Sequence, residues 1–292
     1  MTTIAEYRSS KELFVNLTLR DLRSKYRRSL LGWAWSMLNP IANMIVYTVV
    51  FSFFLRAKPT PGFHGLNSYA LWLLAGMLPW NFFTGSIHGG VGGVTSSGNI
   101  IKKTYFPREM IPMSATAAAL VMHLIEMALL AVVIAAFGNY TVFEFLPVTI
   151  VLIAIVMVFS LGVSLLFSAV NVFYRDVEYF IQILFLAWFY LTPIIYPDTI
   201  VSQHWIGGKK VLSHVVNGVT IPGHHISGGI NFLTILKANP FTDIAACFRA
   251  TMYYGKFPPL LEFGLSVAWA LAAILVGLYV FNRLSSRFAE EL

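Results

Sequence analysis

The sequence predicts an all-α polytopic membrane protein, and three observations lead to this fold class. Of the 292 residues, 57% are hydrophobic and only 11% are charged, whereas a soluble domain carries about 25% charged residues. The mean hydropathy is +0.71. Six apolar runs approach the ~20 residues that a helix needs to cross the hydrocarbon core. Because every backbone amide inside lipid must be bonded within its own segment, we expect these runs to be helices.

We therefore expect six transmembrane helices. The predicted spans are Ala34–Leu55, Tyr69–Ile87, Met113–Phe137, Pro147–Val170, Tyr179–Ile195 and Leu260–Phe281. With six spans both termini share one side, and 13 of the 20 Lys and Arg residues fall on that side. Since cytoplasmic loops carry the excess of cations, both termini are predicted to be cytoplasmic. The net charge of +7 then reflects these loops and anionic lipid, not nucleic acid.

The segment before the first span, residues 1–33, predicts an amphipathic helix. Its apolar positions form one stripe: Val15, Leu19, Leu22, Tyr26, Leu30 and Trp33. Cations flank this stripe: Arg20, Arg23, Lys25, Arg27 and Arg28. Such a helix lies in the membrane interface with Lys and Arg reaching the headgroups. It acts either as a surface anchor and topology signal alone, or also as a contact for a cytoplasmic partner.

The Asn39-Pro40 pair lies near the start of the first span. A proline inside a helix removes one backbone bond and bends the helix. Alternatively Pro40 occupies the first turn of a helix that starts at Leu38, where proline is well tolerated.

The connection between the second and third spans, Ser96–Ser114, is longer than a turn requires. It offers polar and aromatic side chains together: Asn99, Lys102, Lys103, Tyr105, Phe106, Arg108 and Glu109. A short helix stopped by Pro107 would present an aromatic knob with charged flanks. The segment is either a solvated loop with interfacial aromatics or a knob that docks into another protein, since interface cores favour aromatic residues and Arg.

Two further segments flank the fifth span. Arg175 and Asp176 follow the fourth span, where a helix-turn salt bridge would account for them. Residues 196–259 are predicted to lie outside the cytoplasm, and their second half is apolar enough to re-enter the membrane as helices broken at Asn239-Pro240. Non-helical backbone is tolerated at that depth only where protein or a watery cavity covers it. We therefore expect this segment to line or cap a translocation path, before the last span and tail (260–292).

Five side chains within the predicted spans attract attention. Glu126 and His123 lie three residues apart on one helical face, and a charge in mid-bilayer is costly, so they should face protein or water. They form either a proton relay or a buried hydrogen-bonded pair. Trp72, Trp188 and Tyr190 belong either to interfacial aromatic belts or to a lining on which sugar rings stack along a polymer path.

We expect no catalytic, cofactor or metal site in this chain. Cys247 is the single cysteine, and four histidines in the Gly-rich outer segment lack ligand spacing: His204, His214, His224 and His225. The segment Gly207–Lys210 lacks the spacing and the hydroxyl of a P-loop. Energy for vectorial work must therefore come from a partner or from an ion gradient.

Six motifs in this order resemble the membrane subunit of type-2 ABC exporters of polysaccharides such as O-antigen, capsule, galactan and teichoic acid. They are YRRSLLGWAWSMLNP at the first span, LLAGMLPWNFF (Leu73–Phe83), NIIKKTYFPREMIP (Asn99–Pro112), NVFYRDVEYFIQ (Asn171–Gln182), FYLTPIIYP (Phe189–Pro197) and ANPFTDIAACFR (Ala238–Arg249). Together they cover nearly the whole chain. The insertion at about Ser202–Gly229 departs from the shorter family members.

The resemblance implies a homodimer in the bacterial inner membrane, paired with two copies of a separate P-loop ATPase that binds ATP and Mg²⁺. It implies a lipid-linked polysaccharide as substrate, and an interface helix at the N-terminus. It also places a coupling helix within Asn99–Arg108, a second ATPase contact at Phe173–Glu178, and an outer gate in the re-entrant helices.

Three other functions compete with this one. A proton-coupled secondary transporter or flippase would need more intramembrane ionisable groups than His123 and Glu126. A membrane glycosyltransferase would need an acidic cluster or a phosphate-binding loop on the cytoplasmic side. A type-2 ABC permease for a drug or lipid shares the fold, but the polysaccharide-type motifs argue against it.

Overall fold

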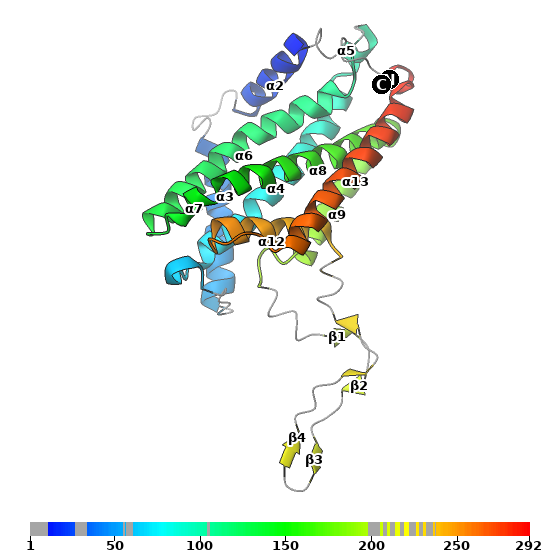
Figure 1. Ribbon diagram of the computed structural model, residues 1–292. Helices are drawn as coiled ribbons and strands as arrows, with labels where there is room; N and C mark the ends of the chain where they lie inside the picture. The colour runs from blue at the N-terminus through cyan, green and yellow to red at the C-terminus, as the bar shows by residue number, and fades with distance from the viewer. Residues whose placement is uncertain are drawn as a thin grey trace.

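The computed structural model describes residues 11–26, 34–54, 56, 61–103, 106–197, 205–206, 209–210, 214–216, 219–221, 226–227, 230–231, 236 and 238–292. Within these residues, a bundle of long helices carries a thin β-ribbon that projects from one end (Figure 1). Four helices are long and apolar enough to cross a membrane: α4 (Tyr69–Ser96), α6 (Met110–Ala136), α8 (Leu146–Phe173) and α13 (Leu260–Ser285). They coincide with the second, third, fourth and sixth predicted spans.

The first and fifth predicted spans are shorter apolar helices, Ile41–Phe54 and Val177–Leu191. The fifth is α9 (Val177–Leu191). The first comprises α3 (Trp35–Tyr47) and a π-helix, η2 (Thr48–Phe54), in which each turn holds more residues than an α turn. Because α3 begins at Trp35 and not at Leu38, Pro40 lies beyond the first turn, where its missing N–H removes a backbone bond. The first-turn interpretation of Pro40 is therefore wrong.

The short helices lie at the two ends of the bundle. They are α2 (Lys11–Tyr26), η3 (Phe63–Gly65), α5 (Gly98–Lys103), α7 (Thr141–Glu144), α12 (Pro240–Met252) and α14 (Phe288–Glu291). We call the end with α5 and α14 the α5 end, and the end with α12 the ribbon end; Figure 1 shows them at opposite ends of the long helices.

Helix α4 starts at a polar cap and runs further than predicted. The Ser68 hydroxyl accepts from the Leu71 N–H at 3.5 Å, which satisfies one of the free donors of the first turn. The helix continues beyond the predicted Ile87 to Ser96. Several glycines lie in this last part, but Val91 and Val94 are buried there, and their packing stabilises the helix.

The tightest packing in the bundle joins α8 to α13. A Cβ atom on Gly162 would collide with the backbone of Ala273 and Ile274, and one on Gly277 would collide with the backbone of Gly162. Small residues of this kind let transmembrane helices approach closely, so that van der Waals contact replaces the missing hydrophobic drive.

Three apolar clusters fill the described interior, and the smallest of them packs Leu22 of α2 against Ala118 and Met122 of α6. The largest contains an aromatic cluster, which we define as Trp80, Phe83, Phe185, Trp188 and Phe241. Its closest rings, those of Trp80 and Phe241, meet edge to face with centroids 4.9 Å apart. The second cluster lies at the α5 end and includes Leu17, Ile101, Phe106, Phe281 and Phe288. Thus each end of the bundle has its own apolar core.

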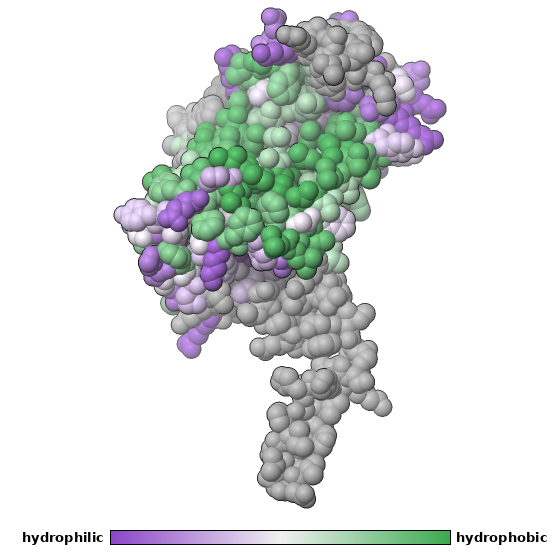
Figure 2. All heavy atoms as spheres, in the orientation of Figure 1, coloured by the Kyte–Doolittle hydropathy of each residue, from purple (hydrophilic) through white to green (hydrophobic). Residues whose placement is uncertain are grey.

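Figure 2 shows a hydrophobic band across the middle of the bundle, with hydrophilic residues gathered towards both ends. Helices α9 and α13 carry exposed apolar side chains, among them Ile183, Leu186, Leu271 and Leu275. Such a band is what a lipid-embedded surface requires.

The ribbon adds strands that the sequence did not predict. It consists of β1 (Trp205–Ile206), β2 (Lys209–Lys210), β3 (His214–Val216), β4 (Val219–Ile221), β5 (Ile226–Ser227) and β6 (Ile230–Asn231). These pair antiparallel as β1–β6, β2–β5 and β3–β4, so the chain folds back on itself once. The strands are two or three residues long and are separated by Gly-rich pieces, which is why no alternating pattern marks them in the sequence.

Candidate functional site

The α5 end holds the residues predicted to meet a partner. Asn99, Lys102 and Lys103 are exposed on α5, and Arg108 is partly exposed after it. The apolar side of the same helix points inward, because Ile101 is buried in the cluster at this end. The short helix therefore presents its amide and its two cations outward.

Phe106 does not project as a knob. Its side chain is 7% exposed and belongs to the cluster at the α5 end, and Glu109 beside it is also buried. In this conformation the ring is unavailable to another protein, because the chain after Pro107 turns into α6 and brings it against the bundle. Tyr105, the other predicted knob residue, lies outside the described residues.

Helix α2 packs beside α6, and only part of its predicted stripe is exposed. Val15 and Leu19 remain exposed and free to meet lipid, whereas Leu22 is buried. Leu17, which the stripe omitted, is buried as well. Among the predicted interface residues, Arg20 forms an ion pair with Asp21, and Arg23 is exposed. The structure does not describe Arg27, Arg28 or the side chains of Lys25 and Tyr26.

Asn171 joins the α8–α9 turn to the end of α4. Its side chain is buried; Oδ1 accepts from the Glu178 N–H at 3.1 Å, and Nδ2 donates to the Thr95 hydroxyl at 3.3 Å. Arg175 and Asp176 are exposed in this turn, and Arg175 makes no ion pair with either neighbouring carboxylate in the described part of the chain. The helix-turn salt bridge is therefore absent, and both side chains face outward near α5.

A buried cation organises the ribbon end. Arg249 of α12 donates to the carbonyl oxygens of Pro193 at 2.6 Å and of Ile194 at 2.5 Å, in the turn that follows α9. It also donates to the Trp72 carbonyl at 3.4 Å, and its guanidinium carbon lies 3.6 Å from the Trp72 ring centroid. Tyr69 donates its hydroxyl to Ile195 in the same turn.

The burial of Arg249 requires this set of acceptors. The side chain is only 7% exposed, and a buried guanidinium is costly unless carbonyl oxygens and an aromatic face replace water. Gly76 gives it room, because a Cβ atom there would lie 2.8 Å from the guanidinium nitrogen Nη2. One cation thereby joins α4, α12 and the turn after α9.

Asn239 makes the second polar junction at this end. Its Oδ1 accepts from the Phe241 N–H at 3.0 Å and from Trp188 Nε1 at 2.6 Å, while Nδ2 donates to the Thr192 hydroxyl at 2.8 Å. Pro240 occupies the first position of α12, which suits a residue without N–H. The pair that we expected to break a helix therefore begins one, and Asn239 bonds directly to the predicted path residue Trp188.

The three predicted path aromatics differ in exposure. Trp72 is 2% exposed, and its Nε1 donates to the Tyr254 hydroxyl at 3.1 Å, so its ring faces protein. Trp188 is half-buried in the aromatic cluster, and Tyr190 is 51% exposed. Of the three, Tyr190 offers most ring surface to a passing molecule.

Two tyrosines outside the long helices complete the ribbon end. Desolvation by burial raises the pKa of Tyr253 and of Tyr196 above the usual value. Both hydroxyls therefore stay neutral and donate, Tyr253 to the Leu66 carbonyl and Tyr196 to the Tyr190 carbonyl, each at 2.8 Å.

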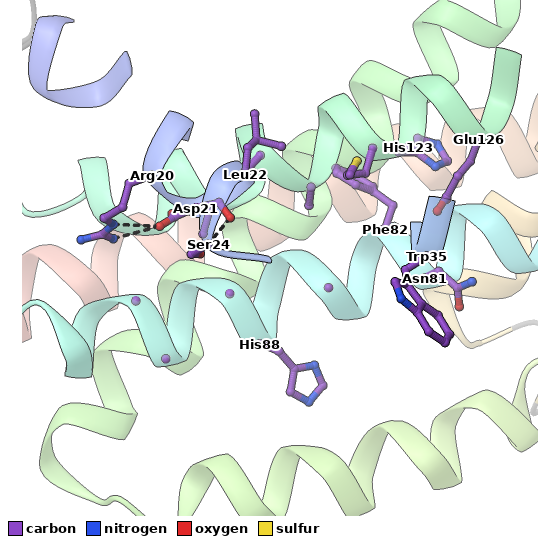
Figure 3. Close-up of a pocket in the computed structure, with 18 of the residues that line it drawn as sticks. Arg20, Asp21, Leu22, Ser24, Trp35, Asn81, Phe82, His88, His123 and Glu126 are labelled. Carbon is purple, nitrogen blue, oxygen red and sulfur yellow. Dashed lines mark hydrogen bonds and ion pairs between the residues drawn. The ribbon is translucent and has the colours of Figure 1, made fainter. Parts of the chain in front are cut away.

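His123 and Glu126 lie on one face of α6, as predicted, and line a cleft of about 970 Å³. The cleft lies between α2 and α3 on one side and α4 and α6 on the other. Figure 3 shows Arg20, Asp21 and Ser24 at one end of it and Glu126, Trp35 and Asn81 at the other.

Sequence reasoning missed Arg249 and Asn171 as individual residues, although both belong to motifs that it quoted. The rule that singled out Glu126, a charge within an apolar helix, applies equally to Arg249. In the described parts of the chain, no group of three or more His, Cys, Asp or Glu residues could hold a metal ion. Of the outer histidines, only His214 lies among the described residues.

Comparisons with known proteins identify a family and several relatives of this chain. The profile of the ABC-2 type transporter family matches residues 12–222. The O-antigen export system permease protein RfbA of Klebsiella pneumoniae is 28% identical over 96% of this chain and 95% of its own length. RfbA of Myxococcus xanthus is 27% identical over 99% and 98%. The polysialic acid transport protein KpsM of Escherichia coli is 22% identical over 65% of this chain and 72% of its own length.

Proposed function

The chain belongs to the ABC-2 type transporter family, and from this premise we propose that it is the membrane-spanning subunit of an ATP-driven exporter of a lipid-linked polysaccharide. The observation that carries the proposal is the similarity to RfbA permeases from two organisms over nearly the full length of both chains. The substrate is of the O-antigen type, with teichoic acid as the alternative polymer.

In the proposed complex, two copies of the chain form the channel and two separate P-loop ATPase subunits bind ATP and Mg²⁺. Each chain contributes six spans to the inner membrane, with both termini in the cytoplasm. The exposed Lys102 and Lys103 of α5 support a docking role for the α5 end, since Lys and Arg pair with acidic surfaces. Asn99, Arg108, Arg175 and Asp176 join this contact.

The ribbon end is proposed as the outer gate. The turn after α9 is bonded to α12 through Asn239 and Arg249, so movement of α12 would move this turn and Trp188 together. Such rigid coupling is what a gate driven from the opposite side of the membrane requires.

The test uses inside-out membrane vesicles that contain the chain, its ATPase and endogenous lipid-linked polysaccharide. ATP should drive the polymer into the lumen, where a polysaccharide-degrading enzyme added outside no longer reaches it. Orthovanadate should stop this movement, and a protonophore should leave it unchanged. Movement that needs no ATP and stops with the protonophore would instead establish the proton-coupled alternative.

A further inference from the structure

The cleft between α2, α3, α4 and α6 contains a polar group that the proposed channel and gate do not use. His123 is 1% exposed, and neither ring nitrogen has a hydrogen-bond partner among the described residues. Its ring is held in place by Phe82, stacked with centroids 5.0 Å apart, and by Phe248 at 6.2 Å. A buried imidazole without partners is costly, so a rotation of the ring that turns a nitrogen into the cleft would be stabilised by a molecule that bonds to it there.

The groups beside His123 are those that recognise hydroxyls. Glu126 lies about one turn further along α6, and Figure 3 shows its carboxyl directed towards Trp35 and the Asn81 amide. Together these side chains donate and accept hydrogen bonds. Trp35 is 47% exposed and offers an aromatic face. A sugar ring has hydroxyls at its edge and apolar C–H groups on its faces, so it matches both features.

The charge of the lining favours a neutral ligand over a phosphate. Among the described lining residues, Arg20 supplies the only Arg or Lys group, and its guanidinium is paired with Asp21 at 3.0 Å. That pair lies at the opposite end of the cleft from Glu126 (Figure 3). Arg and Lys are the side chains that most often recognise phosphate, whereas the His123 end presents an imidazole, an amide and a carboxyl.

On the face of α4 that lines the cleft, two glycines leave space although no neighbouring atom requires a glycine there. A Cβ atom on Gly85 or Gly92 would meet nothing within 4 Å, although both residues lie inside the helix and line the cleft. Glycine in a helix interior costs about 1 kcal/mol relative to alanine. Glycines at these positions therefore weaken the helix and leave space for an occupant.

We infer that the inner end of this cleft, formed by His123, Glu126, Asn81 and Trp35, is a subsite for one sugar ring of the exported polysaccharide. The inference rests on the proposed function, because it takes the polymer as the ligand. His123 and Glu126 hold the ring hydroxyls, and Trp35 covers an apolar face of the ring. The volume of about 970 Å³ is at the upper end of ligand cavities, so neighbouring sugars also fit.

The experiment measures protection of a thiol in the cleft of the intact complex with its ATPase in nanodiscs. Cys247 is the single cysteine and is buried, so Ala119→Cys, one turn before His123 in the lining, introduces the reactive thiol. The probe is lipid-free oligosaccharide cut from the polysaccharide of the host cell. At about four times its Kd it should slow maleimide labelling about fivefold. Asn282→Cys, exposed at the α5 end, serves as the control thiol and should label at an unchanged rate.

Three test variants and one control variant in the Ala119→Cys background sharpen the result. His123→Phe keeps the stack on Phe82 and removes both ring nitrogens, and Glu126→Gln removes the carboxylate; each should abolish the protection. Gly85→Leu places a side chain in the cleft, at a position where a Cβ atom meets nothing within 4 Å, and should also abolish it. Leu129→Phe on the same helix, outside the cleft, should retain it.

Failure of this inference is distinguishable from failure of the proposed function. If the wild-type complex moves polysaccharide in vesicles but oligosaccharide gives no protection, or if His123→Phe and Glu126→Gln both keep it, the subsite is wrong and the exporter stands. Protection by added phosphatidylglycerol alone would assign the cleft to lipid and overturn the sugar subsite. Absence of both polysaccharide movement and protection would overturn both.

Discussion

The two ends of the bundle are held together by different forces. At the ribbon end, buried polar groups tie α12 to the turn after α9, with Arg249 and Asn239 each bonded to several partners. At the α5 end, Asn171 supplies one buried polar junction, but an apolar cluster around Ile101 and Phe106 does most of the joining, and the cations face outward. Directional bonds fix a geometry, whereas apolar packing tolerates small shifts. The ribbon end is thus built for a defined arrangement, and the α5 end for contact with another molecule.

The largest effect on stability is expected when Arg249, the buried cation of the ribbon end, is replaced. Arg249→Leu leaves the carbonyls of Pro193 and Ile194 buried without a donor, which should lower the free energy of unfolding by roughly 3 kcal/mol or more. Arg249→Lys should rescue only part of this, since an ammonium lacks the planar fork. The measurement is the midpoint temperature at which buried Cys247 becomes reactive to a maleimide dye in detergent.

Arg283→Gln provides the control for this change. Arg283 is exposed near the α5 end and bonds only to the Tyr279 hydroxyl in the described structure, so its loss should shift stability by less than about 0.5 kcal/mol. Equal effects of the two substitutions would contradict the contrast between the ends.

The next largest effect is expected where α8 and α13 cross, in the part of the bundle between the two ends. Gly277→Val would force a side chain into the backbone of Gly162, and overpacking of this kind costs about 3 kcal/mol. Gly264→Val on the same helix meets nothing within 4 Å and should be neutral. Thermal midpoints of the two variants, measured through Cys247, check the expectation, and similar midpoints would argue against a close α8–α13 contact.

A smaller effect isolates one bond of the ribbon end. Trp188→Phe and Asn239→Ala each remove the 2.6 Å bond between these residues, so the double variant should be more stable than the sum of the two losses predicts. The coupling energy should be about 1 kcal/mol in a double-mutant cycle. Strictly additive losses would mean that the bond contributes nothing and that Asn239 acts through its cap alone.

The smallest effect on stability is expected at the α5 end. Lys102→Glu combined with Lys103→Glu changes exposed side chains and should alter unfolding by less than about 0.5 kcal/mol. It should nevertheless weaken binding of the partner ATPase about tenfold, because it reverses the charge of the docking surface. Lys256→Glu, exposed at the ribbon end, should leave both properties unchanged. Co-purification and ATPase rates provide the measurement, and undiminished binding would exclude α5 from the contact.

Much of the bundle could be predicted because a long apolar run in lipid has few alternatives to a helix. The starts of α4 and α13 at Tyr69 and Leu260 coincide with predicted span starts. The end of α4 could not be predicted, since the burial of Val91 and Val94 that sustains it depends on neighbouring helices. Six spans and the homodimer remain predictions.

The candidate sites were less accessible from the sequence, because hydrophobicity alone does not give the direction of a side chain. Phe106 has the composition of an interface knob, yet its ring turns inward at the start of α6. Arg249 could be singled out as a charge within an apolar segment, but its three carbonyl acceptors lie far away in the sequence and are brought together only by the fold. His123 and Glu126 could be paired by helical spacing, but the cleft that they share depends on α2 and α3.

The π-helix η2 leaves the first predicted span with a segment that is wound more loosely than an α-helix. Because a π turn holds more residues than an α turn, rewinding Thr48–Phe54 as α-helix would turn α3 about its axis by roughly 100° relative to the chain that follows. Asn43 and Trp35 would then leave the cleft wall that they form with α4. Distances between spin labels at Ile41 and Gly264, compared with and without ATP, would reveal such a screw motion. Thr48–Phe54 would thereby convert a local change of backbone winding into opening or closing of the cleft beside α3.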